Sequence, residues 1–229
     1  MADLDTLKQE LVETCAAIVR SGILSLSGHG NVSLRVPGRD ELLLTSGGRL
    51  DNLTLADIAH LRLDGELLAG TLVPTAHEIV HMHTLIYRER EDVGCVIHTH
   101  SPYATAFAVA GQPIQCWSEA AARFGLDEGA PVAAYGPRGS QESLDNIRRV
   151  LTPTNKAVLL ANHGVLVFDR TAQAAIGVSV ALEETAQLGL YAAAIGGARD
   201  IPPALRAFTR ERAQQFAAMG TLSAQHGER

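Results

Sequence analysis

The spacing of hydrophobic residues changes several times along the chain, which indicates alternating helices and strands. Apolar side chains three and four residues apart predict helices over about residues 5–21, 75–88, 102–110, 141–151, 172–195 and 203–219. Short alternating or continuous apolar runs predict strands over about residues 31–36, 41–44, 93–98, 157–162 and 164–168. A further short helix is expected over about residues 54–59.

Helices and strands follow one another throughout, without an internal repeat, a low-complexity tract or a linker. This order predicts an α/β/α layered arrangement around a mixed sheet. A chain of 229 residues is long enough to bury a substantial core and short enough for one domain. We therefore expect a single domain over residues 1–229.

The amino-acid composition limits the partners and the cellular location that we expect for this domain. The net charge is −6 and no basic cluster stands out, so we expect no nucleic-acid partner. No apolar run reaches transmembrane length, and the N-terminal residues lack the pattern of a secretory signal, so we expect no membrane association. The three cysteines are widely spaced and form no CxxC motif, which is typical of reduced residues in a cytoplasmic protein.

Histidines carry the clearest chemical signal. In the segment Val96-Ile97-His98-Thr99-His100, the two histidines alternate at the end of a predicted strand, so their side chains share one face. His163 lies between Asn162 and Gly164, where two further predicted strands meet. Imidazole is the commonest protein ligand for divalent transition metals, and three such ligands leave a coordination position for substrate. The pattern predicts a metal site.

The lysines argue against the main alternative for carbonyl chemistry. A Schiff-base mechanism needs a lysine desolvated in a pocket. Lys8 falls in the first predicted helix, on an exposed-looking face, and Lys156 follows a polar turn. Neither position suits that role, so a metal ion is the better candidate for the electrophile.

With these motifs in hand, the chain resembles the class II aldolase/adducin family, which includes the fuculose-phosphate and ribulose-phosphate aldolases. The resemblance runs from about Leu7 to Tyr191. It is carried by five motifs in order: Gly30-Asn31-Val32-Ser33, Thr45-Ser46-Gly47-Gly48, His83-Thr84-Leu85-Ile86-Tyr87, Val96-Ile97-His98-Thr99-His100-Ser101 and Ala161-Asn162-His163-Gly164.

The resemblance implies one divalent metal ion per subunit (Zn, Mn, Co or Fe), held by His98, His100 and His163. It also implies a three-layer α/β/α fold around a largely antiparallel sheet, and a homotetramer with active sites at subunit interfaces. The expected activity is that of a carbon–carbon lyase, in which the ion stabilises an enolate or enediolate as a Lewis acid.

One segment departs from the pattern of the sugar-phosphate aldolases. Those enzymes carry Pro-Ser-Ser-Glu followed four residues later by His, whereas this chain reads Pro74-Thr75-Ala76-His77-Glu78-Ile79-Val80-His81-Met82-His83. Counted from Pro74, His77 takes the position of the Glu and His81 that of the later His. Counted back from His98, these positions fall on Ile79 and His83 instead.

Glu78 is the one carboxylate in that segment, and we choose it as the acid/base or a fourth metal ligand. A solvated residue at a helix N-terminus is the competing interpretation. His77, His81 and His83 are further catalytic candidates, each with a structural role as an equal alternative.

We expect a small anionic substrate bound by Asn31, Thr45, Ser46, Gly47 and Gly48, whose backbone and hydroxyl groups can cradle an anion. The Ser-Ser pair has lost a hydroxyl, and Gln115-Cys116-Trp117 replaces a segment where the aldolases carry a tyrosine. These changes favour decarboxylation of a hydroxy-aromatic or hydroxy-pyridine carboxylate. Arg35 or Arg49 would then pair with the carboxylate and Trp117 would stack on the ring.

Three alternatives remain open at the level of sequence. The first is aldol cleavage of a sugar phosphate of the fuculose or ribulose type. The second is a non-catalytic adducin-like binding domain, although such a domain has no need of the three histidines. The third is a dehydratase or an epimerase that uses the same ion.

Overall fold

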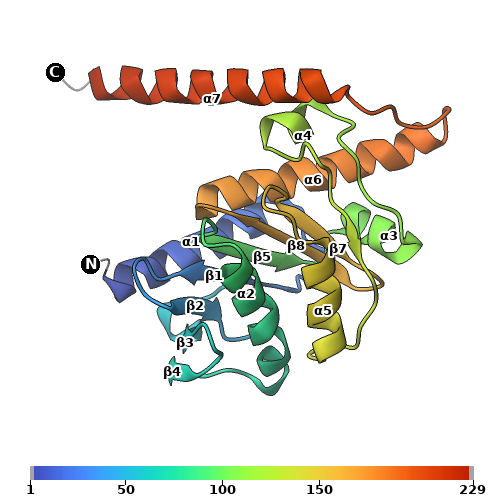
Figure 1. The fold of residues 1–229 in the computed structure, drawn as a ribbon. Helices are drawn as coiled ribbons and strands as arrows, with labels where there is room; N and C mark the ends of the chain where they lie inside the picture. The colour runs from blue at the N-terminus through green and yellow to red at the C-terminus, as the bar shows by residue number, and fades with distance from the viewer. Residues whose placement is uncertain (1–2, 227–229) are drawn as a thin grey trace.

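The computed structural model describes residues 3–226, with side chains described as far as residue 216. Within this range the strands form one eight-stranded sheet in the order β4-β3-β2-β1-β5-β8-β7-β6 (Figure 1). The strands are β1 (Gly30–Arg35), β2 (Glu41–Thr45), β3 (Ile58–Arg62), β4 (Leu67–Ala69), β5 (Cys95–Thr99), β6 (Val132–Ala133), β7 (Ala157–Leu160) and β8 (Gly164–Asp169).

Every neighbouring pair in this sheet is antiparallel except β6 and β7, which run parallel. The mixed, largely antiparallel sheet expected from the resemblance is thereby confirmed. The central strand β5 lies between β1 and β8, and His98 on β5 is opposite Asn31 on β1. This register sets two polar side chains beside each other on one face of the sheet.

Helices cover both faces of the sheet (Figure 1). Helices α2 and α5 pack on one face, over a core that includes Leu44, Val96 and Leu166. The other face is covered by α1, α3 and α6 through two further hydrophobic clusters. The helices are α1 (Leu4–Ser21), α2 (His77–Glu89), α3 (Pro102–Ala110), α4 (Glu119–Arg123), α5 (Gln141–Val150), α6 (Ala172–Ala193) and α7 (Pro203–His226).

Strand β1 shows how the alternation of the sequence divides the two layers. Val32 and Leu34 belong to the cluster under α1. Asn31, Ser33 and Arg35 point to the other face, where each hydrogen-bonds a residue of α2. A polar strand face is therefore buried, and helix α2 supplies the partners that buried polar groups require.

The largest difference from the expected elements lies in residues 54–69. The predicted helix over residues 54–59 is only a single 3-10 turn, Leu55–Asp57, and the chain continues into strands β3 and β4. Ile58, Ala59 and Leu61 are buried. So short an apolar segment does not separate a buried strand from a helix, which is why the prediction was wrong.

Helix α7 packs against α4 and extends along the top of the view in Figure 1, where it carries exposed Leu205 and Phe208. Within residues 3–226, no helix combines the length and the apolar composition that a membrane crossing requires.

A long-range cap connects α6 to the segment that follows His100. The carboxylate of Glu183, buried in α6, accepts hydrogen bonds from the backbone N–H groups of Tyr103 and Ala104, both at 2.8 Å. These donors lie in the first turn of α3, where the N–H groups lack partners inside the helix. The cap fixes the chain just beyond the His98–His100 pair.

We expect Glu183→Gln to lower the free energy of unfolding by about 1–3 kcal/mol, because the amide nitrogen would direct an N–H group toward one of these donors. Urea unfolding followed by circular dichroism measures the change. Glu184→Gln, at the exposed neighbouring position, is the matched control. Equal stability of the two variants would contradict the role of the cap.

Candidate metal centre

Three histidines from two parts of the chain meet at one end of β5. His98 is in β5 and His100 follows it, while His163 occupies the turn between β7 and β8. Their potential ligand atoms all lie within 4.8 Å of one another. Among the described residues, no other group of histidine, cysteine or acidic side chains has this geometry.

Close backbone approach makes this convergence possible. A Cβ on Gly164 would lie 2.6 Å from the carbonyl oxygen of Thr99 and 2.8 Å from Cδ2 of His100. Asn162 adopts φ 58°, a left-handed conformation that asparagine tolerates better than most residues. The Asn162-His163-Gly164 sequence therefore suits a turn that must deliver an imidazole against a neighbouring strand.

Hydrogen bonding prepares His98 as a ligand. Its Nδ1 lies 3.0 Å from the carbonyl oxygen of Val165, which fixes the proton on Nδ1 and leaves the lone pair of Nε2 for a metal. The Nε2 atoms of His98 and His100 are 3.2 Å apart. Two ligands of a tetrahedral zinc ion at ordinary bond lengths are about 3.4 Å apart, so the spacing of this pair of donors suits such an ion.

The protonation state also suits metal binding. Burial lowers the pKa of His98 well below its ordinary value, and the nearby His163 and His100 lower it further. Burial likewise lowers the pKa of His100, and it lowers that of His163 to about 4. The three imidazoles are thus neutral near pH 7, which is the form that binds metals.

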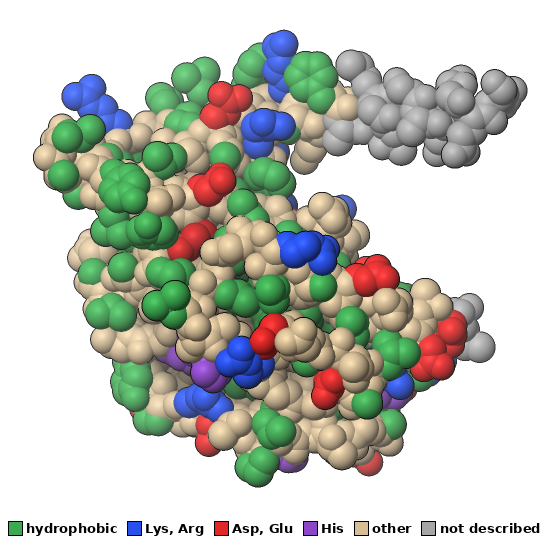
Figure 2. Space-filling view, turned by 180° about the vertical axis from the view of Figure 1, so that it is seen from behind, with side chains coloured by type: hydrophobic (Ala, Val, Ile, Leu, Met, Phe, Trp, Pro, Cys, Tyr) green, Lys and Arg blue, Asp and Glu red, His purple; other side chains and the backbone are tan. Residues whose placement is uncertain are grey.

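The three histidines line a cavity of about 250 Å³. The lining also includes Asn31, Gly47 and Gly48 from the predicted anion-binding loops, and Arg49 at its edge. Figure 2 shows histidine side chains reaching the surface beside basic groups. The remaining lining residues are His29, Gly30, Thr75, Ala76, Ile79 and Arg138.

Several predicted substrate-binding residues lie outside this cavity lining. Arg35 donates to the backbone oxygens of Val93 and Tyr87, so its guanidinium holds the end of α2 and does not contact the cavity. Trp117 packs on Phe107, with ring centroids 5.5 Å apart. Neither residue lines the cavity within this chain, and the substrate contacts predicted for Arg35 and Trp117 stay predictions.

Thr45 and Ser46 are buried beside the cavity and are not part of its lining. The hydroxyl of Thr45 accepts a hydrogen bond from the backbone N–H of Val32 at 3.3 Å. The hydroxyl of Ser46 has no hydrogen-bond partner among the described residues. Thr45 thus supports the strand pair, while Gly47 and Gly48 present backbone to the cavity.

The catalytic candidates in the α2 segment are dispersed. His77 and His81 are exposed, and Cε1 of His81 would lie 2.9 Å from a Cβ on Gly65. Glu78 is half exposed, and its carboxylate pairs with Arg138 at 2.6 Å. Among the residues of α2, Ile79 lines the cavity. The count back from His98, which assigns Ile79 to the position of the Glu, agrees with this geometry.

His83 is fully buried between β1 and α2. Its Nε2 lies 2.6 Å from Oδ1 of Asn31, and its Nδ1 lies 2.7 Å from the hydroxyl of Ser33. Burial lowers its pKa to about 3. This histidine therefore orients Asn31 toward the cavity and does not itself reach it.

Two residues of the cavity with basic side chains, Arg138 and His29, are not among the sequence candidates. Arg138 lies in a Gly-Pro-Arg-Gly turn before α5, and His29 precedes β1. The ring of His29 stacks near His100, with centroids 6.4 Å apart. The one sequence signal that could have pointed to Arg138 is its place as a charged residue in a glycine-rich turn ahead of a helix cap. No local pattern relates that turn to the histidines.

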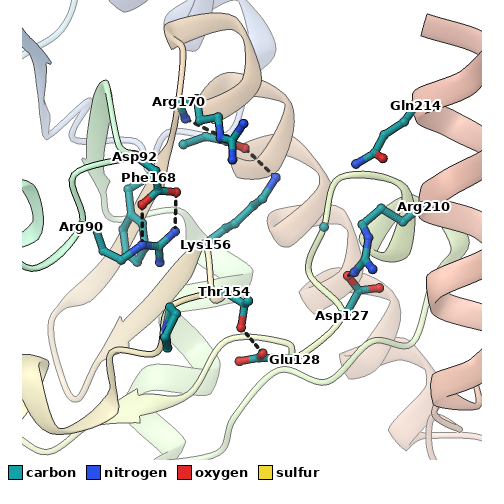
Figure 3. A pocket seen from close by; sticks show the side chains of 13 residues that line it. Arg90, Asp92, Asp127, Glu128, Thr154, Lys156, Phe168, Arg170, Arg210 and Gln214 are labelled. Atoms are coloured by element: carbon teal, nitrogen blue, oxygen red, sulfur yellow. Dashed lines mark hydrogen bonds and ion pairs between the residues drawn. The ribbon is translucent and has the colours of Figure 1, made fainter. Parts of the chain in front are cut away.

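A second, larger cavity of about 490 Å³ lies at the opposite ends of β7 and β8, next to α7 (Figure 3). Its charged groups are largely paired with one another: Arg90 with Asp92, Lys156 with Asp169, and Arg210 with Asp127. It contains no group of metal ligands within the described residues. The smaller cavity is therefore the candidate site.

Known proteins resemble this chain in both sequence and fold. The family model of the class II aldolase and adducin N-terminal domain matches residues 9–190. The 5-methylthioribulose-1-phosphate/5-deoxyribulose-1-phosphate aldolase of Rhodospirillum rubrum is 34% identical over 182 residues, covering 79% of each chain. The 5-deoxy-D-ribulose 1-phosphate aldolase of Bacillus thuringiensis serovar kurstaki is 30% identical over 198 residues, covering 85% of this chain and 89% of the relative.

A solved structure of an L-fuculose 1-phosphate aldolase superposes with a TM-score of 0.80 at 25% identity, covering 93% of this chain and 98% of that one. The fold and the sequence together define a class II aldolase-like protein. The chain belongs to the class II aldolase and adducin N-terminal domain family, which confirms the resemblance noted from its motifs.

We expect alanine at His98, His100 or His163 to weaken zinc binding by roughly 100-fold or more, because each change removes one of three neutral imidazoles. Competition with a chromophoric chelator measures the affinity. His81→Ala, which removes an exposed imidazole outside the cluster, should bind zinc as tightly as the unchanged protein. A similar loss in that control would disprove the assignment of the ligands.

The buried His83 predicts a pH dependence of stability. Its pKa is about 3 in the folded protein against an ordinary value of 6.5, so between these values the unfolded chain takes up a proton that the folded chain does not. Stability is unaffected by this group above pH 6.5 and falls as the pH decreases toward about 3. His83→Gln should therefore show a shallower decline of the urea midpoint across that window. Identical slopes would be the contrary result.

Proposed function

We propose that this protein is a divalent-metal-dependent carbon–carbon lyase that cleaves a short sugar phosphate by a retro-aldol reaction. The supporting observation is the cluster of three neutral imidazoles beside a small cavity lined by two guanidinium groups and no carboxylate. Several relatives are named as aldolases of ribulose or fuculose 1-phosphates. These relatives favour aldol cleavage over the decarboxylation expected from the sequence.

His98, His100 and His163 would hold the ion, with the proton of His98 kept on Nδ1 by the carbonyl of Val165. When bound, the ion supplies Lewis acidity where negative charge develops on substrate oxygens. Asn31 presents an amide to the cavity and is fixed there by His83. The backbone of Gly47 and Gly48 lies open to the same space for an anionic group.

The size of the cavity limits the substrate. Pockets that enclose drug-sized ligands measure roughly 300–1,000 Å³. At about 250 Å³, this cavity suits a molecule of a few carbon atoms with one anionic group. A phosphorylated short-chain ketose meets both requirements.

Aldol cleavage and decarboxylation differ in the proton transfers that they need, and this difference bears on a second candidate reaction. Aldol cleavage requires a base to take a hydroxyl proton and an acid to protonate the new carbanion. Decarboxylation of an ionised acid also leaves a carbanion that an acid must protonate, but it needs no base, because CO₂ departs from the carboxylate. The position of α2 that faces the cavity is Ile79, and the carboxylate of Glu78 is paired with Arg138. This arrangement favours decarboxylation of a small hydroxy acid as the second candidate. His29 is then the imidazole outside the cluster that can move a proton in the cavity.

We expect the zinc- or manganese-loaded protein to release dihydroxyacetone phosphate from 5-deoxyribulose 1-phosphate or fuculose 1-phosphate. A coupled reductase assay measures the product. CO₂ release from a panel of hydroxy-aromatic acids measures the second candidate. His163→Ala is the control for turnover at the cluster.

The outcomes separate the hypotheses. Triose phosphate without CO₂ supports aldol cleavage, and CO₂ alone supports decarboxylation. Failure of the metal-loaded protein in both assays would overturn the lyase proposal and favour a binding domain. The homotetramer with interfacial sites and the cytoplasmic location stay predictions. Sedimentation equilibrium and cell fractionation test them.

A further inference from the structure

The turn between β6 and α5 brings a permanent positive charge to the metal centre. Arg138 lines the cavity together with His100 and His163. Its Nη2 donates to the backbone oxygen of Thr75 at 2.6 Å, and its Nε lies 2.6 Å from the carboxylate of Glu78. Both partners belong to the segment that begins α2, so the turn before α5 and the start of α2 together hold the guanidinium at the cavity.

This charge lies in the same cavity as His100 and His163. A guanidinium beside a site for a divalent cation adds repulsion to that site. A ligand with anionic oxygens between the two cations would relieve the repulsion, because it attracts both.

Arg138 is better suited to this role than the second guanidinium of the cavity. Arg49 is committed to Asp51, through Nε and Nη2 bonds of 2.9 Å to the two carboxylate oxygens. Arg138 makes one contact with a carboxylate and one with a backbone carbonyl, which leaves its Nη1 group for a ligand.

The pairing with Glu78 is exchangeable. The side chains of Arg138 and Glu78 are 43% and 50% exposed, and ion pairs of this exposure contribute little to stability. Glu78 also packs against the turn, since a Cβ on Gly139 would lie 3.2 Å from the Cβ of Glu78. The carboxylate therefore orients the guanidinium without binding it so tightly that a substrate anion could not compete.

We propose that Arg138 is a specificity-determining residue that binds the anionic oxygens of the substrate, and that Glu78 is a positioning residue that holds its guanidinium at the cavity. The inference rests on the proposed lyase function for the identity of the substrate. The anionic group is a phosphate if the reaction is aldol cleavage and a carboxylate if it is decarboxylation. Glu78 then acts through Arg138 and is not the acid/base expected from the sequence.

Calorimetric titration of the zinc-loaded protein with inorganic phosphate, and separately with 2-hydroxybenzoate, tests the anion site. We expect Arg138→Met to weaken binding of the preferred anion by about 10- to 100-fold, since a charge-assisted hydrogen bond is lost, with Arg138→Lys intermediate. Zinc affinity, measured alongside, should not decrease in either variant. The anion whose binding weakens more in these variants identifies the class of anionic group that Arg138 binds.

Arg148→Met is the matched control. Arg148 pairs with Glu89 of α2 at 2.8 Å, and the two side chains are 41% and 40% exposed, but this pair lies outside the cavity lining. The control removes the same charge from a similar α2 contact and should bind the anion as the unchanged protein does. Equal binding by the Arg138 and Arg148 variants would overturn the proposal, as would a zinc-loaded protein that binds neither anion.

Steady-state kinetics separates positioning from catalysis at Glu78. We expect Glu78→Gln to raise KM several-fold with kcat within about twofold, and Glu78→Asp to restore part of the loss in KM. A general acid/base would instead lose about 100- to 10,000-fold in kcat. That result would overturn the positioning role. Absence of turnover in the unchanged protein would refute the proposed function and leave the anion titrations to decide the role of Arg138.

Discussion

The close contact of three strand segments at one end of β5 is the constraint on which the site depends. Gly30 on β1 and Gly164 on β8 both lie so near this strand end that a Cβ would approach a backbone oxygen to 2.8 Å or less. Neither position can accommodate a residue other than glycine. This proximity brings the turn after β7 against the His98–His100 pair and determines where a metal can be held.

A second constraint comes from polar groups buried away from water. Asn31 and Ser33 form a hydrogen-bonded network with His83 and Tyr87 between β1 and α2. Burial keeps His83 neutral, so the network depends on hydrogen bonds and not on charge. The same burial orients Asn31, which lines the cavity. The sheet and the site are thus stabilised by one set of contacts.

Much of this arrangement could be predicted from sequence because the signals are local. Alternation in His98-Thr99-His100 indicates two side chains on one face, and the Asn-His-Gly turn marks the third histidine of the cluster. Two features could not be predicted. The rotation of α2, which turns Ile79 to the cavity and Glu78 to solvent, depends on how the helix packs on the sheet. The reach of Arg138 depends on a turn remote in sequence from every histidine.

The hydrogen bonds between β1 and α2 have a wider consequence. They join β1 to the middle and end of the helix, at His83, Tyr87 and the carbonyls that Arg35 contacts, while the first turn carries none of them. His77 and Glu78 are exposed and take no part in these bonds, so substitutions at these two positions should leave the helix attached to the sheet. A scaffold anchored in this way separates folding from chemistry, because the exposed side chains at the helix start can be exchanged while the three histidines keep their places.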